Sequence, residues 1–306
     1  MSGIIITMLM HKHFFIRKSK SFNKTIKLFF LSLSLISLIS CSTNNKPFQY
    51  TDRGRYIVDN SFPSQSQNER IRFLIMHYTA LDDDTSLKVL TKGNVSAHYL
   101  VNSLPKNRDL KPVILQLVPE EKRAWHAGIS SWNGRGNIND TSIGIEIVNL
   151  GFTQDMLNEK NWFPFNDKQI DALAMLTKDI IERNKIEPDN ILGHSDIAPL
   201  RKQDPGRLFP WKKLALMGIG AWPDESSVNR YLAGRDKYSP GDVLEIQKSL
   251  KKYGYDKIPQ SGVLDEETRA TISAFQMHFR QDDIAGNADA ETEAIAKAMV
   301  EKYRKF

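Results

Sequence analysis

Two apolar runs of strand length limit what this chain can fold into. Residues 71–76 read IRFLIM, and residues 141–148 read TSIGIEIV, the second being rich in β-branched side chains. Segments of this length and composition predict β-strands. Between these two runs, residues 96–102 and 113–118 predict two further strands. After the second run, residues 190–193 predict a short strand.

A helix is predicted before the last of these strands, over residues 166–185. Asn166 and Gln169 form a start that resembles a capping box. Apolar side chains then recur at helical spacing, at Ile170, Leu173, Ala174, Ile180 and Ile181. Strands that alternate with helices indicate an α/β core. The polar segment that follows holds two prolines and a glycine within residues 221–240, and we expect a linker over residues 221–237.

From Gly241 onward the pattern becomes helical and contains an internal repeat. Residues 262–268 (GVLDEET) and 286–292 (GNADAET) share the pattern G-x-x-D-x-E-T. In each copy the glycine suits a turn, the aspartate suits a helix N-cap, and a glutamate lies near the positive end of the helix. Two unrelated capped helices would give the same pattern, but the equal spacing favours a repeat. Residues 238–303 resemble the three-helix peptidoglycan-binding domain that is attached to many cell-wall hydrolases.

The positive charge of the chain lies at one end. The formal net charge is +6, but six of the 42 lysines and arginines lie within residues 1–41, which hold no aspartate or glutamate. The other 36 match the 36 acidic residues, so residues 42–306 are formally neutral. Because a basic stripe is the footprint of a nucleic-acid binder, we expect no nucleic-acid partner.

The cationic end has the pattern of a secretory signal, which we predict over residues 1–40. Lys24 and Lys27 precede an uncharged run over residues 28–39. These twelve residues are too few to span a bilayer, for which ~20 are needed. Cations, an apolar stretch and a small residue are typical of an exported leader.

Cys41 is predicted to carry a lipid. Residues 38–41 (LISC) resemble the lipobox of bacterial lipoproteins, in which the leader is cut before the cysteine and the cysteine is acylated, for example with palmitate. An ordinary signal peptide with an incidental cysteine is the alternative. Cys41 is the only cysteine of the chain, so an internal disulfide does not explain it. Ser42, rather than an aspartate, follows it, which by analogy favours the outer membrane and the periplasm, with a tether over residues 41–60.

Two histidines lie where predicted strands end. His77 directly follows residues 71–76, and His194 directly follows residues 190–193. Sites in open α/β sheets gather outside the carboxyl ends of the strands. Two imidazoles there could bind Zn²⁺, which takes three protein ligands and one water in catalytic sites. Asp204 is the carboxylate that we choose as the third ligand, although structural histidines remain the alternative on these residues alone.

Six short motifs carry a family resemblance, and they occur in order within residues 50–220. They are HYTA at 77–80, SAHY at 96–99, AWHAG at 124–128, IGIE at 143–146, GHSDIAP at 193–199 and KQDPG at 202–206. Together they resemble the zinc N-acetylmuramoyl-L-alanine amidases, which are related to peptidoglycan recognition proteins and to phage lysozyme-type amidases. The resemblance implies a zinc amidase domain over residues 61–220, an α/β fold with a mixed β-sheet and flanking helices. It also implies a small all-α domain of three helices over residues 238–306.

The same resemblance implies a role for each matching residue. His77, His194 and Asp204 would bind one Zn²⁺ per chain, Glu146 would be the acid/base, and Lys202 would stabilise the transition state. The local sequence agrees, because Glu146 lies between isoleucines on a predicted strand, and burial helps a carboxylate to act as a base near neutral pH. Lys202 and Asp204 are two residues apart, so in an extended loop both side chains can point the same way. A salt-bridged Glu146 and a structural ion pair of Lys202 are the alternatives.

The remaining histidines are assigned by their neighbours. His126 and Trp125 are predicted to line the substrate cleft. His98 is predicted as a further substrate-binding residue, with packing as its alternative. His278 lies on a helical face in FQMH and is predicted to be structural.

The reaction that the resemblance implies is hydrolysis of the amide bond between the muramyl lactyl group and L-alanine of the stem peptide. The expected partners are peptidoglycan and, through Cys41, a membrane, and the chain is expected to be a monomer. A non-catalytic peptidoglycan recognition protein is the main alternative. Such relatives typically lack a metal ligand, whereas all three matching positions are filled here. A zinc peptidase that cuts within the stem peptide is a second alternative.

Overall fold

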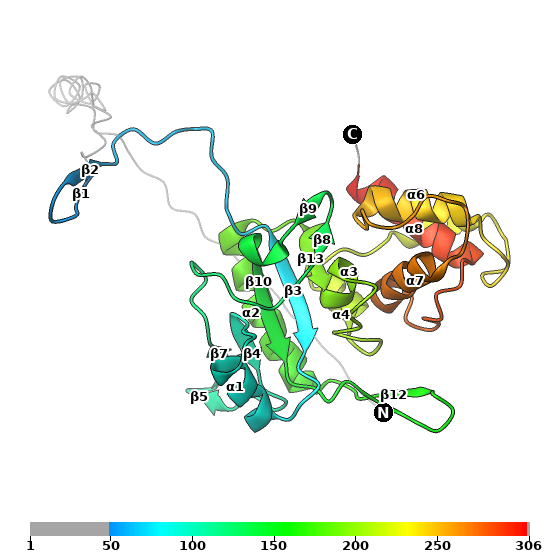
Figure 1. Ribbon diagram of the computed structural model, residues 1–306, viewed down its shortest axis with the longest axis horizontal. Coiled ribbons are helices and arrows are strands. Elements are labelled where there is room, and N and C mark those ends of the chain that lie inside the picture. The colour runs from blue at the N-terminus through cyan, green and yellow to red at the C-terminus, as the bar shows by residue number, and fades with distance from the viewer. Residues whose placement is uncertain (1–48, 305–306) are drawn as a thin grey trace, which may run out of the picture. The chain divides into compact units, whose positions relative to one another are not determined.

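The computed structural model describes residues 49–304, which fall into two compact units, 49–67 and 68–304. The predicted signal and Cys41 lie outside the described residues. In the smaller unit, β1 (Tyr50–Asp52) pairs antiparallel with β2 (Ile57–Asp59), as Figure 1 shows. The sequence predicted a tether over residues 41–60 and did not indicate these strands, because strands of three residues are too short to show a period. The turn is fixed locally, since the N–H of Gly54 donates to Asp52 Oδ1 over 2.8 Å.

The larger unit is built on a five-stranded mixed sheet. Its strands, in spatial order, are β13 (Ile191–Gly193), β3 (Phe73–Tyr78), β10 (Ser142–Ile147), β4 (Tyr99–Val101) and β7 (Leu115–Gln116). The first four run parallel to their neighbours and β7 runs antiparallel to β4. All five predicted strands therefore form, and the expected mixed sheet is confirmed. His77 is the penultimate residue of β3 rather than the residue after it.

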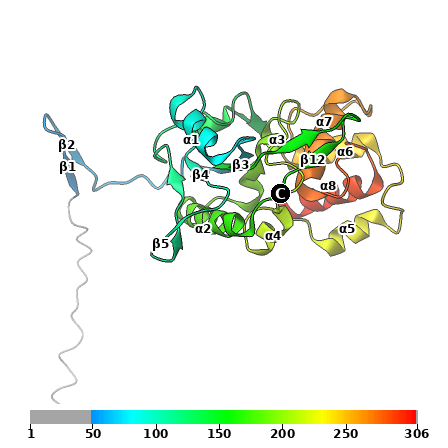
Figure 2. The same ribbon diagram turned by 90° about the horizontal axis from the view of Figure 1, so that it is seen from below.

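The two faces of the sheet have different coverings. On one face, Leu74 and Ile145 belong to a buried cluster with side chains of α2 (Asp167–Asn184) and α4 (Trp211–Leu216). On the other face, Leu100 packs against Leu90 of α1 (Asp83–Lys92), so α1 and α2 lie on opposite sides of the sheet (Figure 2). Because side chains alternate along a strand, His77 shares this second face with Phe73 and Ile75.

Helix α2 begins one residue after its predicted start, and its cap differs from the prediction. The Asn166 side chain accepts a hydrogen bond from the N–H of Lys168, as an N-cap does. Gln169 does not complete a capping box. Its side chain is buried and donates instead to the carbonyls of Val101 and Val148, because the first turn of α2 lies against the sheet.

Short elements complete the larger unit. They are the hairpins β5 (Asn107–Arg108) with β6 (Lys111–Pro112), β8 (Ser131–Trp132) with β9 (Arg135–Gly136) and β11 (Phe152–Gln154) with β12 (Lys160–Trp162), the 3-10 turns η1 (Ile138–Thr141) and η2 (Pro188–Asn190), and the one-turn helix α3 (His194–Ile197). Within residues 49–304, no helix is long and apolar enough to cross a membrane.

Residues 238–304 form the expected three helices, α6 (Val243–Tyr253), α7 (Glu266–Phe279) and α8 (Ala290–Tyr303). The sequence repeat is a structural repeat. Asp265 and Asp289 are the N-caps of α7 and α8, and each accepts from the N–H of the threonine three residues later. A buried glutamine precedes each copy. Gln247 accepts from the N–H of Gly262 and donates to Thr268 Oγ1, and Gln276 makes the same two bonds in the second copy.

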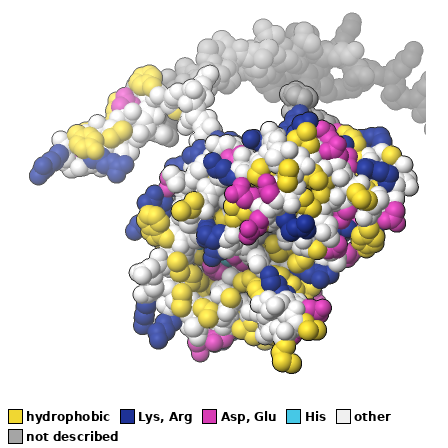
Figure 3. Space-filling view, turned by 45° about the vertical axis from the view of Figure 1, so that its right-hand side comes forward, with side chains coloured by type: hydrophobic (Ala, Val, Ile, Leu, Met, Phe, Trp, Pro, Cys, Tyr) yellow, Lys and Arg dark blue, Asp and Glu magenta, His cyan; other side chains and the backbone are white. Residues whose placement is uncertain are grey.

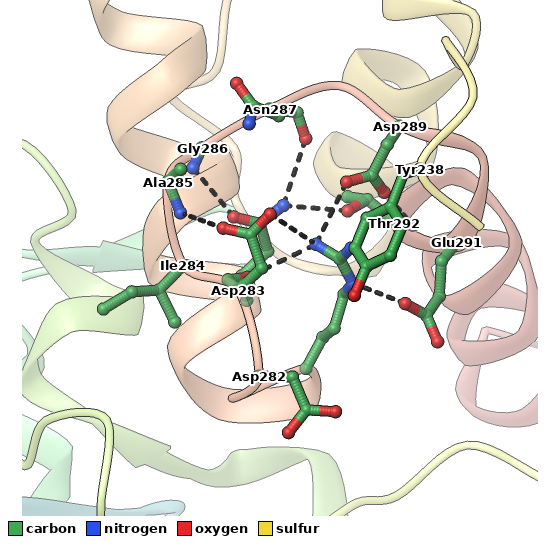
Figure 4. Close-up of polar contacts among 12 residues, drawn as sticks. Tyr238, Asp282, Asp283, Ile284, Ala285, Gly286, Asn287, Asp289, Glu291 and Thr292 are labelled. Carbon is green, nitrogen blue, oxygen red and sulfur yellow. Dashed lines mark hydrogen bonds and ion pairs between the residues drawn. The ribbon is translucent and has the colours of Figure 1, made fainter.

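The loop of the second copy closes around a guanidinium group. Arg280, at the end of α7, is only 6% exposed. It forms ion pairs with Asp289 at 3.0 Å and with Glu291 at 2.6 Å. Figure 4 shows Asp283, Asp289 and Glu291 around this group, whereas the Asp282 side chain points away from it. The acidic cluster is thus neutralised in part from within the fold.

Residues 238–304, called the helical part below, share one hydrophobic core with the sheet. Trp132, on the β8–β9 hairpin, is fully buried against the rings of Tyr253 and Tyr255, with centroids 5.6 and 4.9 Å away. The same buried cluster contains Phe73 and Ile75 of β3. The segment predicted as a linker, 221–237, contains α5 (Glu225–Leu232), whose Tyr231 and Arg230 bond Glu301 of α8. Its polar composition is that of a surface helix.

The surface of the larger unit carries both signs of charge. On the face that Figure 3 shows, lysine and arginine side chains alternate with aspartate and glutamate side chains, and neither sign gathers into a broad field. This distribution agrees with the formal neutrality of residues 42–306.

Candidate functional site

Three side chains converge at the carboxyl end of the central strands. His77 comes from β3, His194 begins α3 directly after β13, and Asp204 lies on the following loop. The His77 and His194 Nδ1 atoms are 3.0 Å apart, and Asp204 Oδ2 lies 2.9 and 3.1 Å from them. The parallel pairing of β13 with β3 sets Gly193 beside Met76 and so brings the two histidines together. The N–H of Ser195 donates to the carbonyl of Asp204 over 2.9 Å, which holds the loop against α3.

The outer nitrogens of the two histidines show which way their lone pairs face. His194 Nε2 lies 3.1 Å from the carbonyl oxygen of Ala127. A carbonyl can only accept, so Nε2 carries the proton and, in the neutral ring, Nδ1 presents a lone pair to Asp204. His77 Nε2 lies 3.0 Å from His126 Nδ1, and His126 Nε2 lies 3.1 Å from Ser142 Oγ. With neutral rings, His77 Nε2–H can donate to His126 Nδ1, and His126 Nε2–H can donate to Ser142 Oγ, so the hydrogen bonds run outward from the cluster.

This arrangement fits a metal ion. Two imidazole lone pairs and a carboxylate oxygen, all buried, face one another at about 3 Å, an arrangement that repels unless a cation lies between them. Two nitrogens and one oxygen, with the fourth position open, form a ligand set typical of catalytic zinc. The edges of the triangle are close to the ~3.3 Å that tetrahedral bonds of ~2.0 Å would give. The outer hydrogen bonds fix ring orientation, as they do at metal sites.

Burial and charge set the protonation of this cluster. Burial, and then the neighbouring His194, lower the pKa of His77 to about 4. Burial alone would raise the pKa of Asp204, but the adjacent histidines outweigh it and hold that pKa well below its usual range. Neutral imidazole and ionised carboxylate are the forms that bind metals, so the cluster is prepared for a cation at neutral pH.

Glu146 lies beside this cluster on the same face of the sheet, in register with His77. Its Oε2 atom is buried and has no hydrogen-bond partner, and Glu146 forms no ion pair within residues 49–304. Burial, and then the charge of Asp204, raise the pKa of Glu146 well above its usual range, although Lys202 acts in the opposite direction. The salt-bridged alternative for Glu146 is therefore not found, and a carboxylate with a raised pKa suits proton transfer.

A cleft of about 390 Å³ opens onto these groups. Glu146, His194, Lys202 and Asp204 all line it, so Lys202 and Asp204 do face the same space, as their spacing predicted. Lys202 makes no ion pair within the described residues, in contrast to the structural alternative considered for it. Trp125 lies at the rim with 54% of its surface exposed, and the Arg123 guanidinium lies 4.0 Å from its ring.

The other histidines have different positions. His126 lines the cleft, but both ring nitrogens face protein groups. Its ring lies over Gly144, where any Cβ would be only 2.4 Å from it. His98 does not reach the cleft: it is fully buried, accepts from the N–H of Gly144 and donates to the carbonyl of Lys122. The packing alternative for His98 describes it, because its ring packs edge-on against the His126 ring, with centroids 5.9 Å apart. His278 is buried on α7, away from the cleft, as predicted.

Sequence reasoning missed several groups around the site. Asn139 Oδ1 accepts from the N–H groups of both His126 and Ala127, at 3.1 and 2.9 Å, and so shapes the segment whose carbonyl meets His194. Ser142 ends the donor chain from His77. Tyr78 lines the cleft, and its burial, with the charge of Asp204, raises its pKa to about 12. Tyr78 follows His77 in the first motif, which was the one available signal.

Comparisons with known proteins agree with this geometry. Residues 67–207 match the family described as N-acetylmuramoyl-L-alanine amidase, and residues 239–295 match the putative peptidoglycan binding domain. The chain is 48% identical to N-acetylmuramoyl-L-alanine amidase AmiD of Escherichia coli K12, over 90% of this chain and 98% of that protein.

Solved structures are similar over most of the chain. Escherichia coli AmiD, in complex with the substrate anhydro-N-acetylmuramic acid-L-Ala-D-gamma-Glu-L-Lys, matches with a TM-score of 0.79 and 50% identity, covering 83% of this chain and 98% of that one. AmpDh3 of Pseudomonas aeruginosa matches with a TM-score of 0.71 and 41% identity, covering 84% and 100%. With two histidines, a carboxylate and a glutamate whose Oε2 atom is buried converging on one site, and with this similarity over nearly its whole length, the chain belongs to the N-acetylmuramoyl-L-alanine amidase family.

Proposed function

We propose that this protein hydrolyses the amide bond between the lactyl group of muramic acid and L-alanine in peptidoglycan, with one zinc ion bound by His77, His194 and Asp204. The observation that supports it most is the contact of His194 Nε2 with the Ala127 carbonyl, which turns the Nδ1 lone pair toward Asp204 and His77. The family membership supports the reaction, and the structure of the related AmiD is a complex with a muramyl peptide substrate.

Zinc at this position would supply Lewis acidity to the amide carbonyl and make a neighbouring water more acidic, toward a pKa of ~7. Glu146 takes the proton from the attacking water. Its raised pKa keeps the proton available for return to the leaving L-alanine nitrogen. Lys202, which faces the same cleft, opposes the negative charge that develops on the carbonyl oxygen. The products are the glycan and a free stem peptide.

Trp125 is the substrate-binding residue that we propose at the rim of the cleft. Its indole is half exposed, and Arg123 lies against the ring. A flat apolar ring of this kind suits a sugar or an acyl group of the muramyl moiety. His126 instead holds His77, because its ring nitrogens face His77 and Ser142.

We propose that the mature chain is attached to the outer membrane, facing the periplasm, through a lipid on Cys41. The sequence supports this anchor, because a cationic, apolar leader ends in LISC at the only cysteine of the chain. Mass spectrometry of the membrane-extracted protein should find an acylated N-terminal cysteine. A Cys41→Ser protein that stays in the membrane fraction would refute the anchor.

Digestion of purified peptidoglycan tests the reaction. We expect free stem peptides that begin with L-alanine, identified by mass spectrometry, from intact muramyl substrates, anhydro-muramyl substrates or both. Peptides cut internally would instead indicate a zinc peptidase, and binding without release would indicate a recognition protein. Protein freed of metal with a chelator and then reloaded with zinc is the matched control, since it should lose and regain the activity.

A further inference from the structure

The one-turn helix that begins with His194 is completed by side chains of the helical part. Asp196, on α3, is 2% exposed. Its Oδ2 atom accepts from the N–H of Gly193 at 2.7 Å and lies 2.8 Å from His278 Nδ1. Its Oδ1 atom accepts from the hydroxyl of Tyr255 at 2.5 Å. Tyr255 follows α6 and His278 lies on α7, so two of the three partners come from beyond the amidase region.

These contacts bear on the direction of the His194 ring. The Asp196 bond to the Gly193 N–H closes the turn around His194 and so fixes the backbone from which the ring projects. A buried carboxylate stays in one rotamer only if donors surround it. The Gly193 N–H donates to Oδ2 of Asp196. His278 supplies a second donor to Oδ2, and Tyr255 supplies the donor to Oδ1.

Both donors are themselves packed against aromatic rings. The His278 ring stacks on Trp211 of α4, with centroids 3.8 Å apart and planes inclined by 18°. The Tyr255 ring packs edge-on against Trp132, 4.9 Å away. Both residues are buried. Rigid supports of this kind matter at metal sites, where a ligand displaced by a fraction of an ångström binds less tightly.

We propose that Tyr255 and His278 are positioning residues, which act through Asp196 to hold His194 in its metal-binding orientation. The helical part would then be a structural component of the metal centre. This inference rests on the zinc site proposed above and goes beyond the wall-binding role that its family description suggests.

Three variants of the full chain test it. His278→Phe keeps a flat ring beside Trp211 but removes the donor, and His278→Asn restores a donor near the Nδ1 position. Tyr255→Phe removes only a hydroxyl group. Asp256→Ala is the matched control, because Asp256 lies next to Tyr255 and binds the N–H of Gly134 across the same interface without contact to α3.

The measurements are the zinc dissociation constant, by competition with a chromophoric chelator, and the melting temperature of the metal-free protein. We expect His278→Phe and Tyr255→Phe to bind zinc ~10-fold more weakly, at the low end of the range for lost outer partners of a metal ligand. His278→Asn should recover most of the affinity, and Asp256→Ala should keep all of it. At saturating zinc, each variant should retain the wild-type KM.

Two results would overturn the proposal. In the first, the donor-deleting variants melt at lower temperature but bind zinc as tightly as the wild type, so that Asp196 only joins the two parts. In the second, Asp256→Ala weakens zinc binding as much as they do, so that any damage to the interface suffices. A wild-type protein that binds no zinc would refute the proposed function itself, which is a separate and recognisable outcome.

Discussion

Replacement of Glu146 by glutamine separates the chemistry from the fold. The change is nearly isosteric and removes the negative charge and the ability to exchange a proton. Oε2 of Glu146 is buried without a hydrogen-bond partner, so no ion pair is lost with the charge. The zinc ligands His77, His194 and Asp204 make their contacts with one another and not with Glu146, so zinc binding should stay as in the wild type.

The expected loss of activity follows from the lining of the cleft. A general base contributes roughly 10²–10⁴-fold, or about 3–5 kcal/mol of transition-state free energy. Asp204 is the other carboxylate among the lining residues, and both histidines already surround it. His126 has both ring nitrogens engaged. Because no substitute base is available among these groups, we expect kcat to fall by about 10³–10⁴-fold.

The same substitution should alter stability with a defined dependence on pH. Burial raises the pKa of Glu146 above its ordinary value of 4.5. Between 4.5 and the raised value, the folded state binds more protons than the unfolded state, so the free energy of unfolding falls as pH rises. Glutamine does not titrate. Metal-free Glu146→Gln should therefore melt above the wild type at pH 7, and the difference should vanish near pH 4.

The assay combines release of L-alanyl stem peptides from peptidoglycan with zinc content and melting temperature. Glu146→Asp is the matched control, because it keeps a carboxylate on a shorter side chain and should retain more activity than the glutamine variant. Hydrolysis by zinc-loaded Glu146→Gln within tenfold of the wild-type rate would refute Glu146 as the general base. A melting temperature at pH 7 below that of the wild type would refute the account of its burial.

Three further changes test other parts of the structure. Asp204→Asn removes the anionic ligand, so zinc affinity should fall by more than the ~10–100-fold typical of a lost outer partner; unchanged metal content by mass spectrometry would show that the ligand is misassigned. Gln276→Leu leaves two buried groups and one partly buried group of the second repeat unpaired, at about 1 kcal/mol each. Calorimetry should find the melting temperature lower by about 6–12 °C, against little change for a substitution at an exposed position such as Lys251→Gln. Arg183→Ala removes the paired bonds to Glu120, at 2.7 and 2.9 Å. Arg183 lowers the pKa of Glu120, so the pair stabilises the fold above pH 4.5 and this stabilisation is lost in acid. It amounts to about 0.5–1 kcal/mol for a half-exposed pair. Equal differences in melting temperature between variant and wild type at pH 7 and at pH 3 would contradict this account.

The strands and helix caps were predictable where a short stretch of sequence determines the local structure. The apolar runs at 71–76 and 141–148 became the central strands β3 and β10. The N-caps Asp265 and Asp289 were visible because capping is local in sequence. Gln247 and Gln276 were not, since each lies ten or more residues from the glycine that it binds. The sequence repeat therefore predicted the caps but not the buried glutamines that brace them.

The site was predictable in its residue types and less so in its geometry. The order of motifs assembled His77, His194, Asp204, Glu146 and Lys202, and the structure brings all five to one cleft or its wall. Pattern alone did not distinguish His98 from His126, because each lies within one of the short motifs, SAHY at 96–99 and AWHAG at 124–128. One residue decides their difference: Gly144 leaves room for the His126 ring because it has no side chain, and its N–H donates to His98.

The boundary between the two parts was the hardest feature to predict, and the reason is physical. Composition identifies a linker by polarity, and residues 221–237 are polar because α5 lies at the surface. The side chain that joins the parts is Trp132, from a two-residue strand nearly a hundred positions earlier, where no periodicity can form. Gly254 accommodates it, since any Cβ there would lie 2.6 Å from the indole. Once Trp132 is enclosed by Tyr253 and Tyr255, the core that begins at Phe73 continues into α6, α7 and α8. The helical part therefore covers the portion of this sheet face at Phe73 and Ile75, and the support of α3 by Tyr255 and His278 is a direct consequence of that packing.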